Sequence, residues 1–137
     1  MDAPPIQYVK TSDGYSIAYR VSGEGAPLVL VPGVFSHLGL HSFNTTRMIF
    51  QPRATQFRFI EYDSRGQGLS TRGLPDALAM EDFLADLVSI LERVGGEPAV
   101  LISTFGFWRV AVRYAVEHPT RCRALVIVRP DHPVGAS

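Results

Sequence analysis

Short runs rich in apolar residues recur along this chain and alternate with segments of helical periodicity. The runs are Pro27–Val31, Phe57–Tyr62, Ala99–Ile102 and Ala124–Val128. Runs of this length suit β-strands that are covered on both faces, as in a parallel sheet. Strands that alternate with helices predict an α/β fold, because each helix carries the chain back across the sheet before the next parallel strand begins.

The N-terminal part of the chain has a different pattern. Tyr8–Thr11 and Ser16–Ser22 are rich in β-favouring residues and flank Asp13-Gly14. This pair favours the positive backbone dihedrals of a tight turn. We therefore expect the first two strands to form an antiparallel hairpin.

Two helices are predicted between the later strands. Four apolar side chains share one helical stripe: Phe83, Leu87, Leu91 and Val94. The second helix is expected over Trp108–His118, where Pro119 ends it. A further helix is expected near Asn44–Ala54.

These patterns together predict a single domain over residues 1–137. Its fold is α/β, with a mostly parallel sheet of about six strands, an N-terminal antiparallel hairpin and flanking helices. A short tail follows from Arg129 to Ser137. Apolar residues make up 46% of the chain and charged residues 19%, which is the composition of a globular protein.

The charge balance and the cysteine count bear on partners and location. Lys plus Arg and Asp plus Glu both number 13, so nothing electrostatic draws the chain to nucleic acid or to an anionic membrane. No apolar run is long enough to span a bilayer, and the first residues lack the pattern of a signal peptide. One cysteine, Cys122, excludes an internal disulfide. We expect a cytoplasmic protein with no metal site and no cofactor.

Two loops carry a resemblance to a known family. Asp63–Ser70 reads D-x-R-G-x-G-x-S and resembles the loop that follows the fourth strand in α/β-hydrolases. Val31–Val34 resembles the oxyanion loop after their third strand, with Pro32 where many members carry histidine. Val31–Leu38 is also similar to hydrolase-like domains attached to bacterial signalling proteins. The resemblance implies a truncated α/β-hydrolase fold. It also implies a structural role for the Asp63 loop, in which the glycines permit a tight path and Arg65 can satisfy nearby carbonyls or carboxylates.

The segment Leu101–Phe107 corresponds to the family's nucleophile elbow, a strand–turn–helix of the form G-x-S-x-G. Here Ser103 and Phe107 replace the two glycines, and Phe105 stands at the nucleophile position. A benzyl group has no lone pair that a base could activate. The resemblance therefore implies a hydrolase scaffold without its nucleophile.

The same resemblance places a candidate site around the elbow. The backbone N–H groups of Val34 and Gly106 match the family's oxyanion donors. The candidate pocket comprises seven further residues: Gly33, Phe35, Ser36, His37, Ser103, Thr104 and Phe107. Ser103 is expected to be a tolerated small residue, and Ser36 and His37 are neighbours in sequence, which seldom face each other as nucleophile and base.

In the family, the acid commonly follows the seventh strand and the histidine the eighth. The present sequence ends after the sixth expected strand, Ala124–Val128, which would then form a sheet edge with unpaired backbone groups. Three explanations stay open: a homodimer through this edge, a partner chain that carries the other half, or a fragment.

Two functions are consistent with these features. The first is a non-catalytic α/β-hydrolase-like protein that binds a small apolar ligand or a protein partner. The second is an esterase-type hydrolase that is completed by another chain or uses non-standard catalytic residues. The fold alone does not decide between them.

Overall fold

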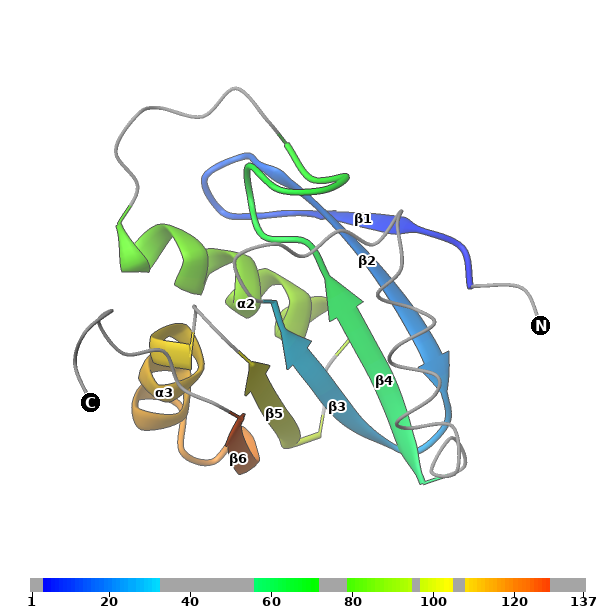
Figure 1. Ribbon diagram of the computed structural model, residues 1–137, viewed down its shortest axis with the longest axis vertical. Coiled ribbons are helices and arrows are strands. Elements are labelled where there is room, and N and C mark those ends of the chain that lie inside the picture. The colour runs from blue at the N-terminus through cyan, green and yellow to red at the C-terminus, as the bar shows by residue number, and fades with distance from the viewer. Residues whose placement is uncertain (1–3, 33–55, 72–78, 95–96, 105–107, 129–137) are drawn as a thin grey trace.

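The computed structural model describes residues 4–32, 56–71, 79–94, 97–104 and 108–128, which contain one sheet and two helices (Figure 1). The strands are β1 (Gln7–Lys10), β2 (Ser16–Gly23), β3 (Ala26–Val31), β4 (Phe57–Tyr62), β5 (Ala99–Thr104) and β6 (Cys122–Val128). The helices are α2 (Met80–Val94) and α3 (Trp108–Glu117). The strand order across the sheet is β1-β2-β4-β3-β5-β6.

The pairing confirms the predicted fold class. β1 pairs antiparallel with β2, and β2 pairs antiparallel with β4. From β4 onward, through β3 and β5 to β6, every pair is parallel. The strand bounds agree with the predicted runs to within two residues, and β6 begins at Cys122 rather than Ala124. The predicted helix near Asn44–Ala54 and the tail from Arg129 lie outside the described residues.

The hairpin between β1 and β2 turns at the predicted Asp13-Gly14 pair. The Thr11 backbone N–H donates to the Tyr15 carbonyl at 2.8 Å, and Gly14 has a φ of 93°. The Thr11 hydroxyl donates to the Asp13 carboxylate inside the loop. Glycine relieves the backbone of the steric cost of a positive φ, so the turn closes without strain.

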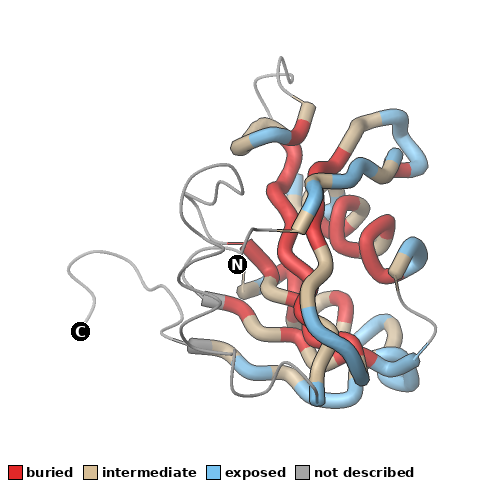
Figure 2. Tube along the Cα trace, turned by 90° about the vertical axis from the view of Figure 1, so that its right-hand side faces the viewer, coloured by how far each residue is buried: buried red, intermediate tan, exposed pale blue. Residues whose placement is uncertain are grey.

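The core lies between the sheet and helices α2 and α3, which pack against each other. Figure 2 shows the buried stretches running along the central strands and one side of the helices. α2 buries Leu87 and Leu91 of the predicted stripe together with Leu84 and Ile90. Phe83 and Val94, also in that stripe, are partly buried against the same core. Its first turn is acidic and its last carries Arg93, a distribution that favours the helix dipole.

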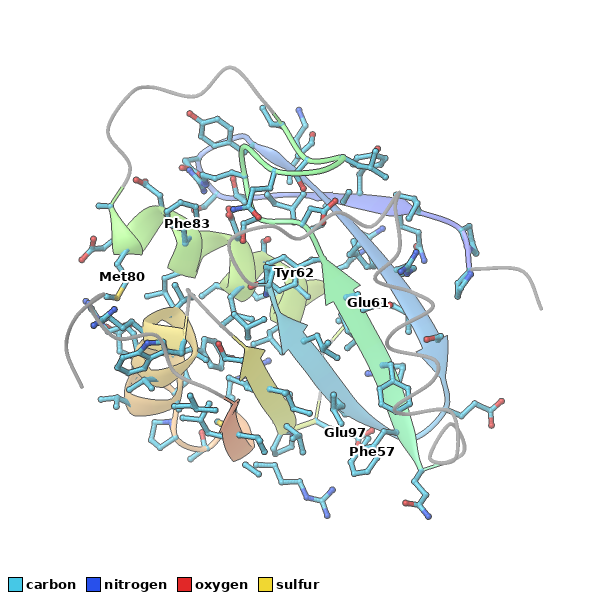
Figure 3. All side chains as sticks on the ribbon, viewed as in Figure 1. Phe57, Glu61, Tyr62, Met80, Phe83 and Glu97 are labelled. Carbon is cyan, nitrogen blue, oxygen red and sulfur yellow. The ribbon has the colours of Figure 1, made fainter. Side chains whose placement is uncertain are left out.

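Alternation along the strands divides the sheet into two faces. Tyr62 belongs to the core that α2 and α3 cover, whereas its neighbour Glu61 points to the opposite face. Figure 3 shows both residues on β4, with Phe83 on α2. Within the described part of the chain, no helix is both long and apolar enough to cross a membrane.

Candidate functional site

The candidate site is built at the carboxyl ends of the parallel strands, where α/β proteins usually bind ligands. β3 and β5 run side by side with Val31 paired to Ser103, and Asp63 follows directly after β4. Of the predicted site residues, the structure describes Ser103 and the backbone of Thr104. The others lie outside the described residues: Gly33, Val34, Phe35, Ser36, His37, Phe105, Gly106 and Phe107.

Ser103 is fully buried, with 0% of its surface exposed. It lies two residues after Leu101 on the same strand, so its side chain points to the face that α2 and α3 cover. Its hydroxyl has no hydrogen-bond partner among the described residues. A serine nucleophile needs an adjacent base and access to substrate. Ser103 has neither within the described part of the chain.

The loop from Asp63 to Ser70 is held by hydrogen bonds within itself and to β2. The backbone N–H of Leu69 donates to the Asp63 carboxylate at 2.9 Å. The Ser70 hydroxyl donates to the Asp63 carbonyl at 2.6 Å and accepts the backbone N–H of Ala18 at 2.9 Å. Gly68 has a φ of 49°, and a Cβ there would lie 2.0 Å from the Asp63 carboxylate. Only glycine fits this turn.

Arg65 lies at the centre of a buried ionic cluster. Its backbone N–H and its Nε each donate to Asp86 at 2.9 Å, one to each carboxylate oxygen. Its Nη1 and Nη2 donate to the two oxygens of Asp13 at 2.7 and 3.1 Å. The guanidinium also lies over the Tyr15 ring, 4.4 Å from its centroid. The side chain thus joins the hairpin turn to α2.

The pKa values of Asp13 and Asp86 are shifted in opposite directions in this cluster. Burial raises the pKa of Asp86 to about 6, although its hydrogen bonds and its attraction to Arg65 oppose the shift. The hydrogen bond from Arg65 lowers the pKa of Asp13 to about 2. Burial, with a smaller contribution from the charge of Asp86, raises the pKa of Tyr62. The bonds from Arg65 to Asp13 and Asp86 indicate a structural role, as the sequence predicted.

A second buried ion pair lies on the opposite face of the sheet. The Nε of Arg20 donates to Glu61 at 3.0 Å, and both side chains are almost fully buried. The two residues are direct partners in the register of β2 and β4. This arrangement neutralises two charges that would be costly to bury separately.

Sequence reasoning identified Arg65 but not its carboxylate partners, and it missed the pair of Arg20 and Glu61. The signal in each case was a charged residue inside a predicted strand or on the apolar stripe of a predicted helix. Arg20 and Glu61 lie within β2 and β4. Asp86 lies on the otherwise apolar stripe of α2, three residues after Phe83. Charged residues inside buried elements are almost always paired. Among the described residues, no group of three or more His, Cys, Asp or Glu side chains could hold a metal ion.

Comparison with known proteins identifies the scaffold. A family model described as alpha/beta hydrolase fold matches residues 26–136. This chain belongs to the α/β-hydrolase family. The strand order and the Asp63–Ser70 loop are thereby explained as parts of a common scaffold.

Several α/β-hydrolase relatives match most of the chain. A proline iminopeptidase, PfmaB, from Pestalotiopsis fici is 28% identical over 93% of this chain and 45% of its own length. A putative carbamate hydrolase, RutD, from a Caulobacter species is 32% identical over 59% of this chain and 32% of its own. The present chain therefore spans less than half the length of these two relatives.

Solved structures give the same result. An α/β-hydrolase from Sphaerobacter thermophilus superposes with a TM-score of 0.74 at 29% identity, over 90% of this chain and 45% of its own. A putative aryl esterase from Burkholderia cenocepacia superposes with a TM-score of 0.75 at 24% identity, over 93% and 47%. The second likeness concerns the fold alone.

Proposed function

We propose that this protein is a non-catalytic α/β-hydrolase-like protein that binds a small apolar ligand or a protein partner. The observation that carries the proposal is the combination of Phe105 at the nucleophile position with the complete burial of Ser103. Phe105 offers no nucleophilic atom, and Ser103 is the nearest serine hydroxyl that could replace it.

The retained framework supports a binding role. The bonds of the Arg65 cluster and of the Asp63–Ser70 loop hold the chain in place where it leaves β4. The resemblance puts the backbone donors of Val34 and Gly106 beside the apex, and such donors do not depend on a side-chain nucleophile. We propose that these donors and the Phe105 ring form a niche, which would suit a small apolar molecule that carries one carbonyl group.

The alternative is an esterase-type hydrolase that is completed by another chain or uses non-standard residues. One observation favours it: the named relatives include a proline iminopeptidase and a putative carbamate hydrolase. A hydrolytic origin of the scaffold agrees with these names. In that case the catalytic groups must be residues other than Phe105, which stands at the apex of the elbow.

Turnover of p-nitrophenyl butyrate by the purified protein distinguishes the two functions. We expect the rate to equal that of the Ser103→Ala variant and of buffer, because neither protein has an activated hydroxyl. A rate that rises in proportion to protein concentration and is lost in Ser103→Ala would instead establish the esterase.

Binding is measured separately with butyranilide, an amide analogue that an esterase does not readily cleave. We expect saturable heat in calorimetry with one site per chain. Substitution Phe105→Ala should weaken binding because it removes the proposed aromatic wall. Absence of saturable binding rejects the apolar ligand and leaves the protein partner as the only form of the proposal.

The proposal includes a cytoplasmic setting, which suits a chain with one thiol, Cys122.

A further inference from the structure

One pair of residues in the hairpin turn is of a kind that modifies itself in flexible chains. Asp13-Gly14 is an Asp-Gly pair, and both residues are exposed in the turn between β1 and β2. In such a pair the backbone nitrogen of the glycine can attack the side-chain carboxyl carbon of the aspartate, since glycine has no Cβ to hinder the approach. The space beside Gly14 is open, because an added Cβ would meet nothing within 4 Å.

The reaction passes through a ring and needs only water. The Gly14 nitrogen bonds to Cγ of Asp13 and loses its proton, while the carboxyl group loses hydroxide, so one water leaves and a five-membered succinimide forms. A second water then opens the ring at either carbonyl. Opening at the former backbone carbonyl leaves a free carboxylate on Cα and carries the main chain through Cγ. The product is isoaspartate, in which the main chain is longer by one carbon.

Both reacting groups are held in the folded protein. Arg65 donates from Nη1 and Nη2 to the two carboxylate oxygens of Asp13, at 2.7 and 3.1 Å. The Thr11 hydroxyl donates to the same carboxylate. The attacking nitrogen is engaged as well, because the Gly14 N–H donates to the Thr11 carbonyl at 3.0 Å. The carboxylate therefore cannot turn towards this nitrogen without losing bonds to Arg65.

The same bonds keep the carboxyl group in its less reactive form. A nucleophile attacks a neutral carboxyl carbon more readily than an anionic one, because hydroxide leaves more easily than oxide. The hydrogen bond from Arg65 lowers the pKa of Asp13 from its ordinary 3.8 to about 2. At pH 7 the neutral fraction of this carboxyl group is therefore smaller by about 60-fold.

Arg65 is itself fixed from the other side. Its side chain is 1% exposed, and its Nε donates to Asp86 of α2 at 2.9 Å. We propose that Asp13-Gly14 is a site of spontaneous isoaspartate formation, and that the Arg65 guanidinium slows this reaction in the folded protein. The longer main chain of the product would move the carboxylate away from Arg65. The modification would thereby release the hairpin turn from α2.

Tryptic peptide mapping measures the conversion, because cleavage after Lys10 and Arg20 gives a peptide of residues 11–20. The isoaspartyl form of this peptide has the same mass and a different retention time, and a protease that cuts before aspartate does not cleave it. The full chain is incubated at pH 7 for several weeks, either folded or unfolded in concentrated guanidinium chloride. We expect the folded chain to convert at least about tenfold more slowly than the unfolded one.

The double variant Arg65→Gln/Asp86→Asn distinguishes the ion pair from the rigidity of the turn. Both charges are removed together, so no unpaired charge stays buried. Solvent screens part of the effect on the exposed Asp13, so we expect the folded variant to convert faster than the wild type by at least about fivefold. Asp82→Asn is the matched control on α2: its carboxylate lies 3.8 Å from Arg65, and its loss should leave the rate unchanged.

Near-UV circular dichroism verifies that each variant keeps its native packing. Arg65→Lys replaces the double variant if that protein does not fold. Lysine keeps a positive charge beside Asp86 but cannot bind both oxygens of Asp13 as a fork, so we expect a rise of at least about twofold.

Three results would overturn the proposal: an unfolded chain that forms no isoaspartate, equal rates in the folded and unfolded chain, or a folded Arg65 variant that converts no faster than Asp82→Asn. The readout does not depend on ester turnover or ligand binding. The modification site and the proposed function can therefore fail separately.

Discussion

Arg65 binds both carboxylate oxygens of Asp86, one through its backbone N–H and the other through its Nε, each at 2.9 Å. The two residues are separated by 21 positions, and both are almost fully buried. A carboxylate that fixes both the backbone and the side chain of one arginine sets the path of the whole Asp63–Ser70 loop. The path of the chain after β4 therefore depends on one residue of α2.

Removal of that carboxylate should destabilise the protein strongly. We expect Asp86→Ala to lower the free energy of unfolding by about 3–5 kcal/mol, because Arg65 would stay buried with half of its partners lost. Asp82→Ala is the control on the same helix: its carboxylate lies 3.8 Å from Arg65 and is 35% exposed, so we expect a loss below about 1 kcal/mol. Urea unfolding measures both, and equal losses would contradict the central role of Asp86.

The raised pKa of Asp86 predicts an unusual pH dependence. Its folded pKa of about 6 lies above the ordinary 3.8, so the folded protein binds this proton more tightly than the unfolded chain. Stability should therefore rise as pH falls from 7 to about 4, by up to about 3 kcal/mol from this group. Asp13 acts in the opposite direction: its folded pKa of about 2 means that its contribution is lost as pH falls from about 4 towards 2.

Urea unfolding at pH 7, 5 and 3 checks these signs with Asp86→Asn as the control. The rise between pH 7 and 5 should be present in the wild type and absent in the variant. A wild-type protein whose stability falls steadily over the whole range would show that Asp86 stays ionised in the fold.

Alanine substitutions at two glycines with positive φ compare the cost of backbone strain alone with the cost of strain plus steric overlap. At Gly14, φ is 93° and an added Cβ meets nothing within 4 Å, so Gly14→Ala should cost only the backbone strain of about 1–2 kcal/mol. At Gly68 the Cβ would also overlap the Asp63 carboxylate, which the Leu69 N–H holds in place. We expect Gly68→Ala to lower the melting temperature clearly more than Gly14→Ala. The reverse order would contradict the close approach in this loop.

Two buried serines provide a similar comparison for hydrogen bonds. Ser70→Ala removes one donated and one accepted bond and should cost about 1–3 kcal/mol. Ser103→Ala removes a buried hydroxyl that has no partner among the described residues, so stability should be unchanged or higher by up to about 1 kcal/mol. A large loss in Ser103→Ala would reveal a bond from Ser103 to some other group.

Restoring the family's serine should not restore activity. We expect Phe105→Ser to hydrolyse p-nitrophenyl butyrate no faster than the wild type, because a serine without a base is a weak nucleophile. Phe105→Ala serves as the control for the loss of the ring. Substantial turnover by the serine variant alone would demonstrate a base near the elbow.

Much of the fold could be predicted from local pattern. Asp13-Gly14 marked the hairpin, the stripe from Phe83 to Val94 marked α2, and the runs at β3, β5 and β6 gave a parallel sheet. Each of these signals lies within a few neighbouring residues. The structural role of Arg65 also followed from its loop, since two glycines around an arginine describe a tight path with one strong donor.

The partners of the buried charges could not be predicted in the same way. Arg65 reaches 52 residues back to Asp13, and Arg20 reaches 41 residues forward to Glu61. Such pairs depend on sheet register and on how α2 lies against the sheet, which no local pattern encodes. For the candidate site, the resemblance named the loops after β3 and β5, most of which lie outside the described residues. The burial of Ser103 needed the three-dimensional packing of α2 and α3.

The strand order also constrains the sequence of events while the chain is being synthesised. β2 pairs with β4, not with the strand that follows it, and Asp13 is neutralised by an arginine that α2 must hold. The first 23 residues therefore cannot reach their final state until residue 86 has left the ribosome. β6 is the opposite case, because it is the last of the described strands to be synthesised and joins a sheet that is already assembled. Synthesis that stops after α3 would consequently spare the ionic cluster and leave β5 without its partner strand β6.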